Sequence, residues 1–274
     1  MKPTELPTRV RATLDMRYPL SSEQKARFRA YRCVKLPHFW TPEVLEYFEP
    51  VVTDWVGKLT ESMPDLSQRD TYGKAFRQAF NLWVHDSRVK EWVLSPRIRM
   101  VMEELLECTG VRMYHDQALY KEPGGGITPW HADQYYWPLD SDRVATLWMP
   151  LHAVPTEMGP LNFAQGSHVL TEGRQLEIGE DSEARIGARM RIGDFPVLQE
   201  PFGLGEVSVH SGWVFHRASP NQSAEMRKVM TGIYMDAQMR ASEPVNAHQS
   251  ADLAQWAPGV AVGELLNSRL NPQL

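Results

Sequence analysis

The chain has 274 residues, 42% of them hydrophobic and 23% charged, which is the balance of a globular protein with a substantial core. A formal net charge of -5 excludes the basic excess that is typical of nucleic-acid-binding surfaces. The sequence has neither an apolar run of roughly eighteen residues for a membrane span nor the apolar stretch of an N-terminal signal. Its two cysteines, Cys33 and Cys108, are too few for a disulfide framework. We therefore expect a cytoplasmic protein, monomeric or homodimeric, that binds neither nucleic acid nor a membrane.

Residues 1–110 are predicted to be mainly helical. The expected helices cover residues 22–32, a segment that starts at Thr41-Pro42 with a capping hydroxyl, and a segment that starts at Ser95-Pro96 and stops at Gly110. Within the second of these helices, Pro50 is expected to cause a kink or an interruption, because proline lacks the backbone N–H. We interpret residues 1–110 as a helical support for the remainder of the chain.

After Gly110 the pattern changes to short segments rich in β-branched and aromatic residues, separated by glycine or proline. The predicted strands cover residues 111–123, 143–154, 159–165, 205–210, 213–219 and 227–237. Residues 170–200 are polar and are interpreted as an irregular insertion, either a lid or a surface excursion. Residues 241–274 are expected to wrap around the surface. The sequence thus predicts one α+β domain over residues 1–274, with an antiparallel β sandwich or barrel at 111–240.

The first candidate for chemistry is a histidine and an aspartate separated by one residue, His131 and Asp133. In an extended backbone both side chains point to the same side, so an imidazole nitrogen and a carboxylate oxygen could bind one cation. A third ligand has to come from elsewhere, and residues 205–230 offer His210 and His216. Two histidines and one carboxylate on one face of a metal are the signature of non-haem iron(II) oxygenases.

Arg227 follows His216 by eleven residues, at the start of an apolar run. If this arginine faces inward, it could hold the carboxylate of an anionic cosubstrate. A surface salt bridge is the ordinary alternative for a single arginine.

Together the segments 131–139, 157–168 and 216–221, followed by Arg227, resemble the phytanoyl-CoA dioxygenase family of 2-oxoglutarate oxygenases. The resemblance covers roughly residues 111–237 and keeps the family order of motifs. It implies a double-stranded β-helix, or jelly roll, buttressed here by the N-terminal helices. It also implies that His131, Asp133 and His216 bind Fe(II), and it favours His216 over His210 as the third ligand.

The same resemblance implies a set of cosubstrate and dioxygen contacts. Arg227 is expected to hold the distal carboxylate of 2-oxoglutarate, with Trp148 beside it. The family often carries a serine two residues after the third ligand, but here Ala218 occupies that position and Ser219 is next to it, so Ser219 is the candidate. Gln117 and Lys121 share one face of the preceding strand, where each could reach the cosubstrate or point to solvent.

The metal motif is followed directly by four candidates for substrate contacts, Gln134, Tyr135, Tyr136 and Trp137. Two of these four are expected to line the pocket. His115, His152 and His168 are expected to be structural. The family implies hydroxylation or oxidative cyclisation at an unactivated C–H bond with Fe(II), 2-oxoglutarate and O2. The carboxylate of Asp133 argues against halogenation, which needs a small residue there.

The substrate is expected to be a small molecule of specialised, natural-product metabolism, because aromatic residues gather around the motif and no basic stretch is present for the phosphates of coenzyme A. The alternatives are an acyl-CoA hydroxylase, a cupin-type metalloenzyme that uses no 2-oxoglutarate, and a jelly-roll binding protein without catalysis.

Overall fold

A computed structural model describes residues 5–70, 73–193 and 195–274. Two antiparallel sheets form its centre, one with the strand order β1-β8-β5-β10-β3-β2 and one with the order β4-β9-β6-β7. The strands are β1 (Cys33–Leu36), β2 (Arg77–Phe80), β3 (Val111–Lys121), β4 (Thr128–His131), β5 (Val144–Pro150), β6 (Leu161–Ala164), β7 (Val197–Gln199), β8 (Val207–Ser211), β9 (His216–Ala218) and β10 (Arg227–Asp236). All six strands predicted after Gly110 are present, and the predicted jelly roll surrounded by helices is confirmed.

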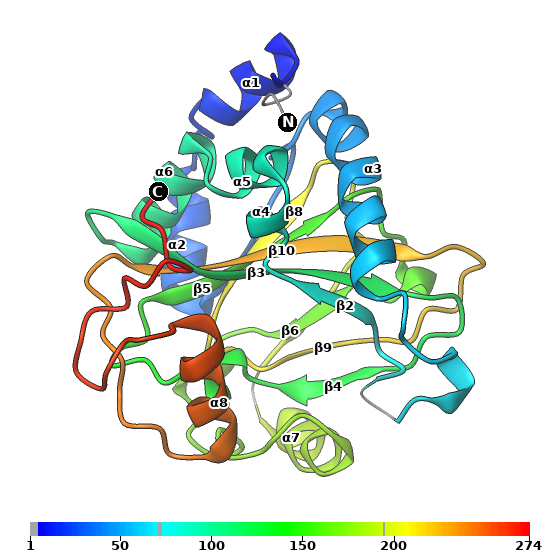
Figure 1. Cartoon of the computed structure of the whole chain (residues 1–274). Helices are drawn as coiled ribbons and strands as arrows, with labels where there is room; N and C mark the ends of the chain where they lie inside the picture. The colour runs from blue at the N-terminus through cyan, green and yellow to red at the C-terminus, as the bar shows by residue number, and fades with distance from the viewer. Residues whose placement is uncertain (1–4, 71–72, 194) are drawn as a thin grey trace.

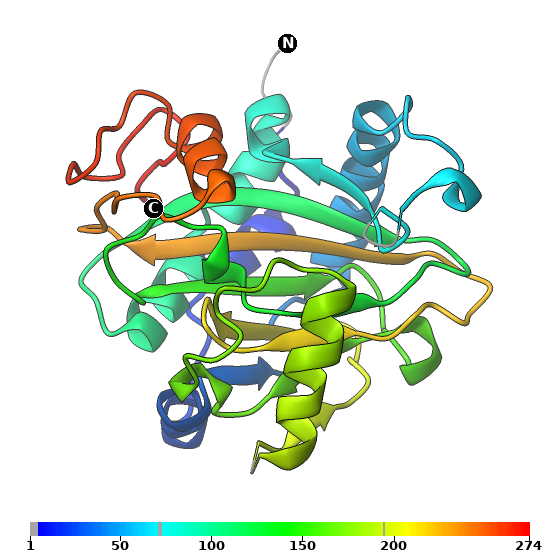
Figure 2. The same cartoon turned by 90° about the horizontal axis from the view of Figure 1, so that it is seen from below.

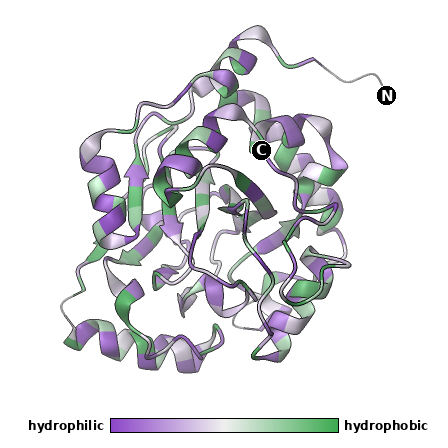
Figure 3. Ribbon diagram, turned by 90° about the vertical axis from the view of Figure 1, so that its left-hand side faces the viewer, coloured by the Kyte–Doolittle hydropathy of each residue, from purple (hydrophilic) through white to green (hydrophobic). Residues whose placement is uncertain are grey.

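The N-terminal helices lie on the outer face of the larger sheet, whereas two later helices lie on the side of the smaller sheet (Figure 1). The helices are α1 (Thr8–Asp15), α2 (Ser22–Tyr31), α3 (Pro42–Leu59), α4 (Leu82–His85), α5 (Ser87–Val93), α6 (Pro96–Leu106), α7 (Glu180–Ile192) and α8 (Ala247–Trp256). On the surface, these helices carry hydrophilic and hydrophobic positions on the same ribbon (Figure 3). Each helix therefore has an apolar side available for packing.

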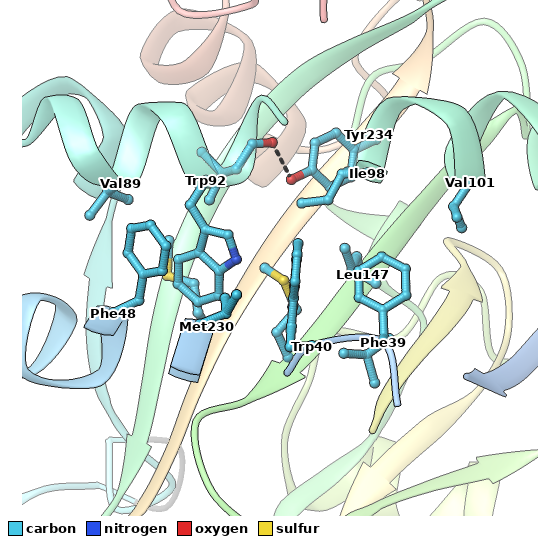
Figure 4. Packing of buried hydrophobic residues seen from close by; sticks show 14 of the residues in the cluster. Phe39, Trp40, Phe48, Val89, Trp92, Ile98, Val101, Leu147, Met230 and Tyr234 are labelled. Atoms are coloured by element: carbon cyan, nitrogen blue, oxygen red, sulfur yellow. Dashed lines mark hydrogen bonds between the residues drawn. The ribbon is translucent and has the colours of Figure 1, made fainter. Parts of the chain in front are cut away.

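The main core lies between the N-terminal helices and the larger sheet (Figure 4). Phe48 of α3 stacks on Trp92 of α5 with ring centroids 4.6 Å apart, and Trp40 meets Trp92 edge to face. The sheet contributes Leu147 and Met230 to the same cluster. The Tyr234 hydroxyl donates a hydrogen bond to the Val93 carbonyl, which satisfies a polar group that is buried in this core.

Along the central strands, successive side chains point alternately into this core and into the interior of the jelly roll. In β5, Ala145, Leu147 and Met149 pack among the helices. The intervening Thr146 and Trp148 face the space between the two sheets, where they line a cavity. Because both faces of the larger sheet are covered, every residue of β5 is buried.

The structure contradicts two details of the predicted helices, the cap at Thr41 and the end at Gly110, and Pro50 does not interrupt its helix. α3 has no side-chain cap from Thr41, and it runs without interruption through Pro50, since packing of its apolar face outweighs the one lost hydrogen bond. α6 ends at Leu106, four residues before Gly110, because Glu107 adopts the left-handed conformation with φ of 53° and closes the helix itself.

Other segments also differ from the prediction. The first 110 residues contribute two strands, β1 and β2, which pair with β8 and β3 at the two edges of the larger sheet. The insertion at 170–200 is not irregular, because it contains α7 and β7. Figure 2 shows α7 in front of the smaller sheet, where its Ile186 and Met190 pack with Trp130 and Phe215. The C-terminal segment includes α8 as well as surface loops.

None of the helices within the described ranges is both long and apolar enough to cross a membrane.

Candidate active site

Three side chains converge in the space between the two sheets. His131 ends β4 and His216 begins β9, and the two residues are directly opposite each other in the β4–β9 ladder. Ala132 is extended, so Asp133 points to the same side as His131 even though a 3-10 turn begins there. One ligand atom from each residue lies within 4.8 Å of the other two. Strand pairing thus brings together the residues that the sequence motif predicts.

Both histidines are oriented by backbone carbonyls. The Nδ1 atom of His131 lies 2.8 Å from the Pro129 oxygen, and that of His216 lies 3.0 Å from the Val214 oxygen. A proton on Nδ1 makes these contacts hydrogen bonds and leaves Nε2 as the free donor atom. Each Nε2 lies 3.5 Å from Oδ1 of Asp133. Two imidazole nitrogens and one carboxylate oxygen facing a common point fit a divalent metal such as iron.

The second oxygen of Asp133 is held by two residues of the larger sheet. The Thr146 hydroxyl donates to Oδ2 at 2.8 Å, and Nε2 of His210 lies 3.2 Å from the same atom. Thr146 and His210 are cross-strand neighbours on β5 and β8. His210 therefore contacts the carboxylate from behind, while His216 lies opposite His131. A turn after Ser211 separates β8, which carries His210, from β9, which begins at His216.

The protonation state of His216 suits metal binding. Burial, with His131 beside it, holds the pKa of the His216 imidazole well below its ordinary value. The ring is therefore neutral at physiological pH, which is the form that binds a metal ion.

Arg227 is a buried cation at one end of the same space. Its side chain is 1% exposed, and its Nη1 donates to the carbonyl of Gly159. The guanidinium carbon lies 5.5 Å from the ring centres of both Phe76 and Trp148. Within the described ranges no carboxylate pairs with Arg227, and its buried Nε has no hydrogen-bond partner. Burial lowers the pKa of Arg227 to about 9, because it removes water from the charged guanidinium. A bound carboxylate would stabilise the charged form.

Lys121 lies next to Arg227, directly across the β3–β10 ladder. Its ammonium donates to the carbonyls of Gly126 and Ser219 at 2.7 and 3.0 Å, and it lies 3.3 Å from the Thr128 hydroxyl. Burial, reinforced by the charge of Arg227, lowers the pKa of Lys121 to about 6. The side chain thus points neither to solvent nor into the cavity, but ties two loops together behind Arg227.

A cavity of about 360 Å³ joins the triad to Arg227 and continues beyond the triad to α8. This volume is in the range of pockets that enclose small organic molecules. Of the predicted residues, Gln117, Tyr136, Trp137 and Trp148 line its wall, together with the triad and Arg227. Two of the four candidates for substrate contacts, Tyr136 and Trp137, thus lie in the wall of this cavity.

Three predicted residues lie outside this wall. The Gln134 amide donates to the Ser141 carbonyl at 2.8 Å, because the 3-10 turn rotates its side chain away from the triad. Tyr135 uses its carbonyl to accept hydrogen bonds from Asn246 and Gln249 near the start of α8. Ser219 presents its backbone carbonyl to Lys121, and its side chain does not reach the cavity.

Several residues of the wall were not predicted from the sequence. They include Gln78 and Phe80 of β2, Ile178 before α7, His115 of β3, which was expected to be structural, and His248, Ala251, Asp252, Gln255 and Trp256 of α8. His152, by contrast, is structural as expected, because its Nε2 accepts from the backbone of Lys228 at 2.9 Å. The sequence feature that could have indicated α8 is Asn246. Its side chain caps the helix by accepting a hydrogen bond from the backbone N–H of Gln249.

A sequence model of the family described as phytanoyl-CoA dioxygenase matches residues 52–229. Among solved structures, the chain is similar to the non-haem, alpha-ketoglutarate-dependent carbocyclase SnoK from nogalamycin biosynthesis, with a TM-score of 0.74 and 22% identity over 93% of this chain and 96% of that one. The corresponding epimerase SnoN gives 0.72 and 21%, over 92% and 97%. EctD from S. alaskensis, solved with 2-oxoglutarate and 5-hydroxyectoine, gives 0.66 and 17%, over 84% and 81%. At these identities the solved structures support the jelly-roll fold.

Proposed function

The chain belongs to the phytanoyl-CoA dioxygenase family of iron- and 2-oxoglutarate-dependent enzymes, and we propose that it oxidises an unactivated C–H bond of a small molecule in natural-product metabolism. The observation that carries this proposal is the meeting of His131, Asp133 and His216 in a cavity that also contains a buried, unpaired Arg227. Hydroxylation and oxidative cyclisation both fit such a site.

In this proposal the triad would hold Fe(II), and Arg227 would hold the distal carboxylate of 2-oxoglutarate. The bound metal and cosubstrate supply the oxidising power when they react with O2. The protein residues supply orientation: Thr146 and His210 fix Asp133, and backbone carbonyls fix the two histidines. Aromatic side chains, among them Trp148, Tyr136 and Trp137, limit the access of water to the reacting atoms.

The wall of the cavity favours a small substrate over an acyl-CoA thioester. Among the described residues that line the cavity, Arg227 is the sole lysine or arginine, and it lies beside Trp148. The phosphates of coenzyme A would therefore meet no second cation inside the cavity. A screen in which a branched acyl-CoA is turned over efficiently would reject this choice of substrate.

Anaerobic titration with Fe(II) and 2-oxoglutarate tests the assignment, since their joint binding produces a weak visible charge-transfer band. We expect the band in the unmodified protein and its loss in His216→Ala, because a ligand is removed. His210→Ala is the matched control: it removes a contact to Asp133 and is expected to weaken but retain the band. An unmodified protein without the band would favour the cupin-type or binding-protein alternatives.

A further inference from the structure

The end of the cavity beyond the triad contains a carboxylate without a cationic partner. Asp252 of α8 lines the wall, and its Oδ2 accepts a hydrogen bond from the Tyr114 hydroxyl. Within the described ranges no lysine, arginine or histidine forms an ion pair with Asp252. An acidic side chain that faces a cavity in this way is available for a ligand.

Aromatic rings surround the same end of the cavity. Trp256 stacks on Phe80 with ring centroids 5.0 Å apart, and its centroid lies 5.1 Å from that of His115. Tyr136 and Trp137 belong to the same wall. The faces of aromatic rings carry partial negative charge, so a group of rings beside a carboxylate is a favourable environment for an organic ammonium ion.

His115 of the same wall does not oppose a cation here. His115 is 4% exposed and its Nδ1 has no hydrogen-bond partner. Burial lowers the pKa of His115 to about 4, so the ring is neutral near pH 7. Arg227 is far away: it starts β10, whereas His115 pairs with Ile233, six residues further along the same strand, which corresponds to roughly 20 Å.

We infer that this end of the cavity binds an alkylammonium group of the substrate and that Asp252 is the residue that selects it. This inference rests on the proposed function and adds to it the substrate class: an organic amine, whose C–H bond is presented to the triad while its cationic nitrogen lies between Asp252 and the rings of Trp256 and Phe80. The cavity then has one cation and one anion at opposite ends, Arg227 for the cosubstrate and Asp252 for the substrate.

Tyr114 is a positioning residue for Asp252. Burial raises the pKa of the Tyr114 hydroxyl well above its usual value, so the phenol keeps its proton and remains a donor. Burial also raises the pKa of Asp252 to about 7. A cation bound beside this carboxylate favours its ionised form, which gives the site a preference for charged over neutral ligands of the same shape.

The test compares choline with its neutral carbon isostere dimethylbutanol, in which carbon replaces the ammonium nitrogen. Isothermal titration calorimetry is performed anaerobically on protein loaded with Fe(II) and 2-oxoglutarate. We expect choline to bind roughly tenfold more tightly than the isostere. Asp252→Asn keeps the shape and an acceptor for Tyr114, and it should remove this preference while the affinity for the isostere and the charge-transfer band stay unchanged.

Glu177→Gln is the matched control, because Glu177 is an exposed acid that does not line the cavity. Its choline preference should equal that of the unmodified protein. Equal binding of choline and the isostere, absence of choline binding at high millimolar concentration, or an unchanged preference in Asp252→Asn would each overturn the inference. The charge-transfer band reports separately on the proposed function, and titration of the metal-free protein tests the ammonium site even if that band is absent.

Discussion

The two ends of the cavity are built from different kinds of structure. At the end proposed for the cosubstrate, Arg227 begins β10 and Trp148 lies in β5, so backbone hydrogen bonds to neighbouring strands hold the main chain at both residues. At the other end, α8 carries Asp252 and Trp256 and is held by side-chain contacts, including those of Asn246 to the Tyr135 carbonyl. The first end is carried by strands alone, whereas the α8 side of the second, which faces Phe80 of β2 and His115 of β3, can change its residues without disturbing the ladder. This division suits an enzyme family with one oxidising centre and many substrates.

The largest effect is expected from Arg227→Ala at the strand-built end. Loss of this buried cation should weaken 2-oxoglutarate binding at least about a hundredfold, since a charge-assisted contact is removed from a desolvated site. The readout is the affinity for the cosubstrate and not the melting temperature, because the change also leaves the buried Gly159 carbonyl without its donor. The measurement is the anaerobic titration of the charge-transfer band with 2-oxoglutarate.

Arg217→Ala serves as the control for that variant. Arg217 lies on β9 but pairs with Glu183 of α7 at 2.8 Å, on the outside of the smaller sheet. Its loss should leave the affinity for 2-oxoglutarate unchanged. Comparable losses in both variants would mean that net charge, and not the position of Arg227, determines cosubstrate binding.

A smaller effect is expected from Thr146→Val, which removes the hydroxyl that orients Asp133. The affinity for Fe(II) should fall about 10- to 100-fold, as is typical when a partner of a metal ligand is lost. Thr231→Val is matched to it, because Thr231 lines the same cavity but donates to the Gln117 carbonyl. Metal titration followed by calorimetry distinguishes the two, and an equal loss in Thr231→Val would argue against a specific role for Thr146.

The smallest effect is expected at the helix-built end, from Asn246→Ala. This change removes the cap of α8 and should cost about 1 kcal/mol of local stability. Hydrogen exchange of the α8 amides should accelerate, while binding of Fe(II) and 2-oxoglutarate stays unchanged. Ser21→Ala removes a comparable cap from α2 and should leave exchange in α8 unaffected. If Asn246→Ala also weakens cosubstrate binding, the two ends are coupled.

The sequence alone was sufficient for the chemistry of the metal motif and for the later strands. His131 and Asp133 are two residues apart, and alternation in an extended backbone places both on one side. The same rule places Gln117 and Lys121 on one face of β3, where Gln117 lines the cavity and Lys121 donates to the carbonyls of Gly126 and Ser219 instead. Such local rules act over a few residues, so they can be applied to a sequence without knowledge of the fold.

Tertiary structure alone decided which distant residues complete the site. Pairing of β4 with β9 puts His216 opposite His131, and the packing of one sheet over the other turns His210 toward Asp133 instead. Likewise, α8 reaches the cavity because Asn246 and Gln249 at its start donate to the Tyr135 carbonyl, which lies more than a hundred residues earlier in the chain. These contacts depend on how elements far apart in the sequence pack against one another. A local sequence pattern covers only a few residues, so it cannot predict them.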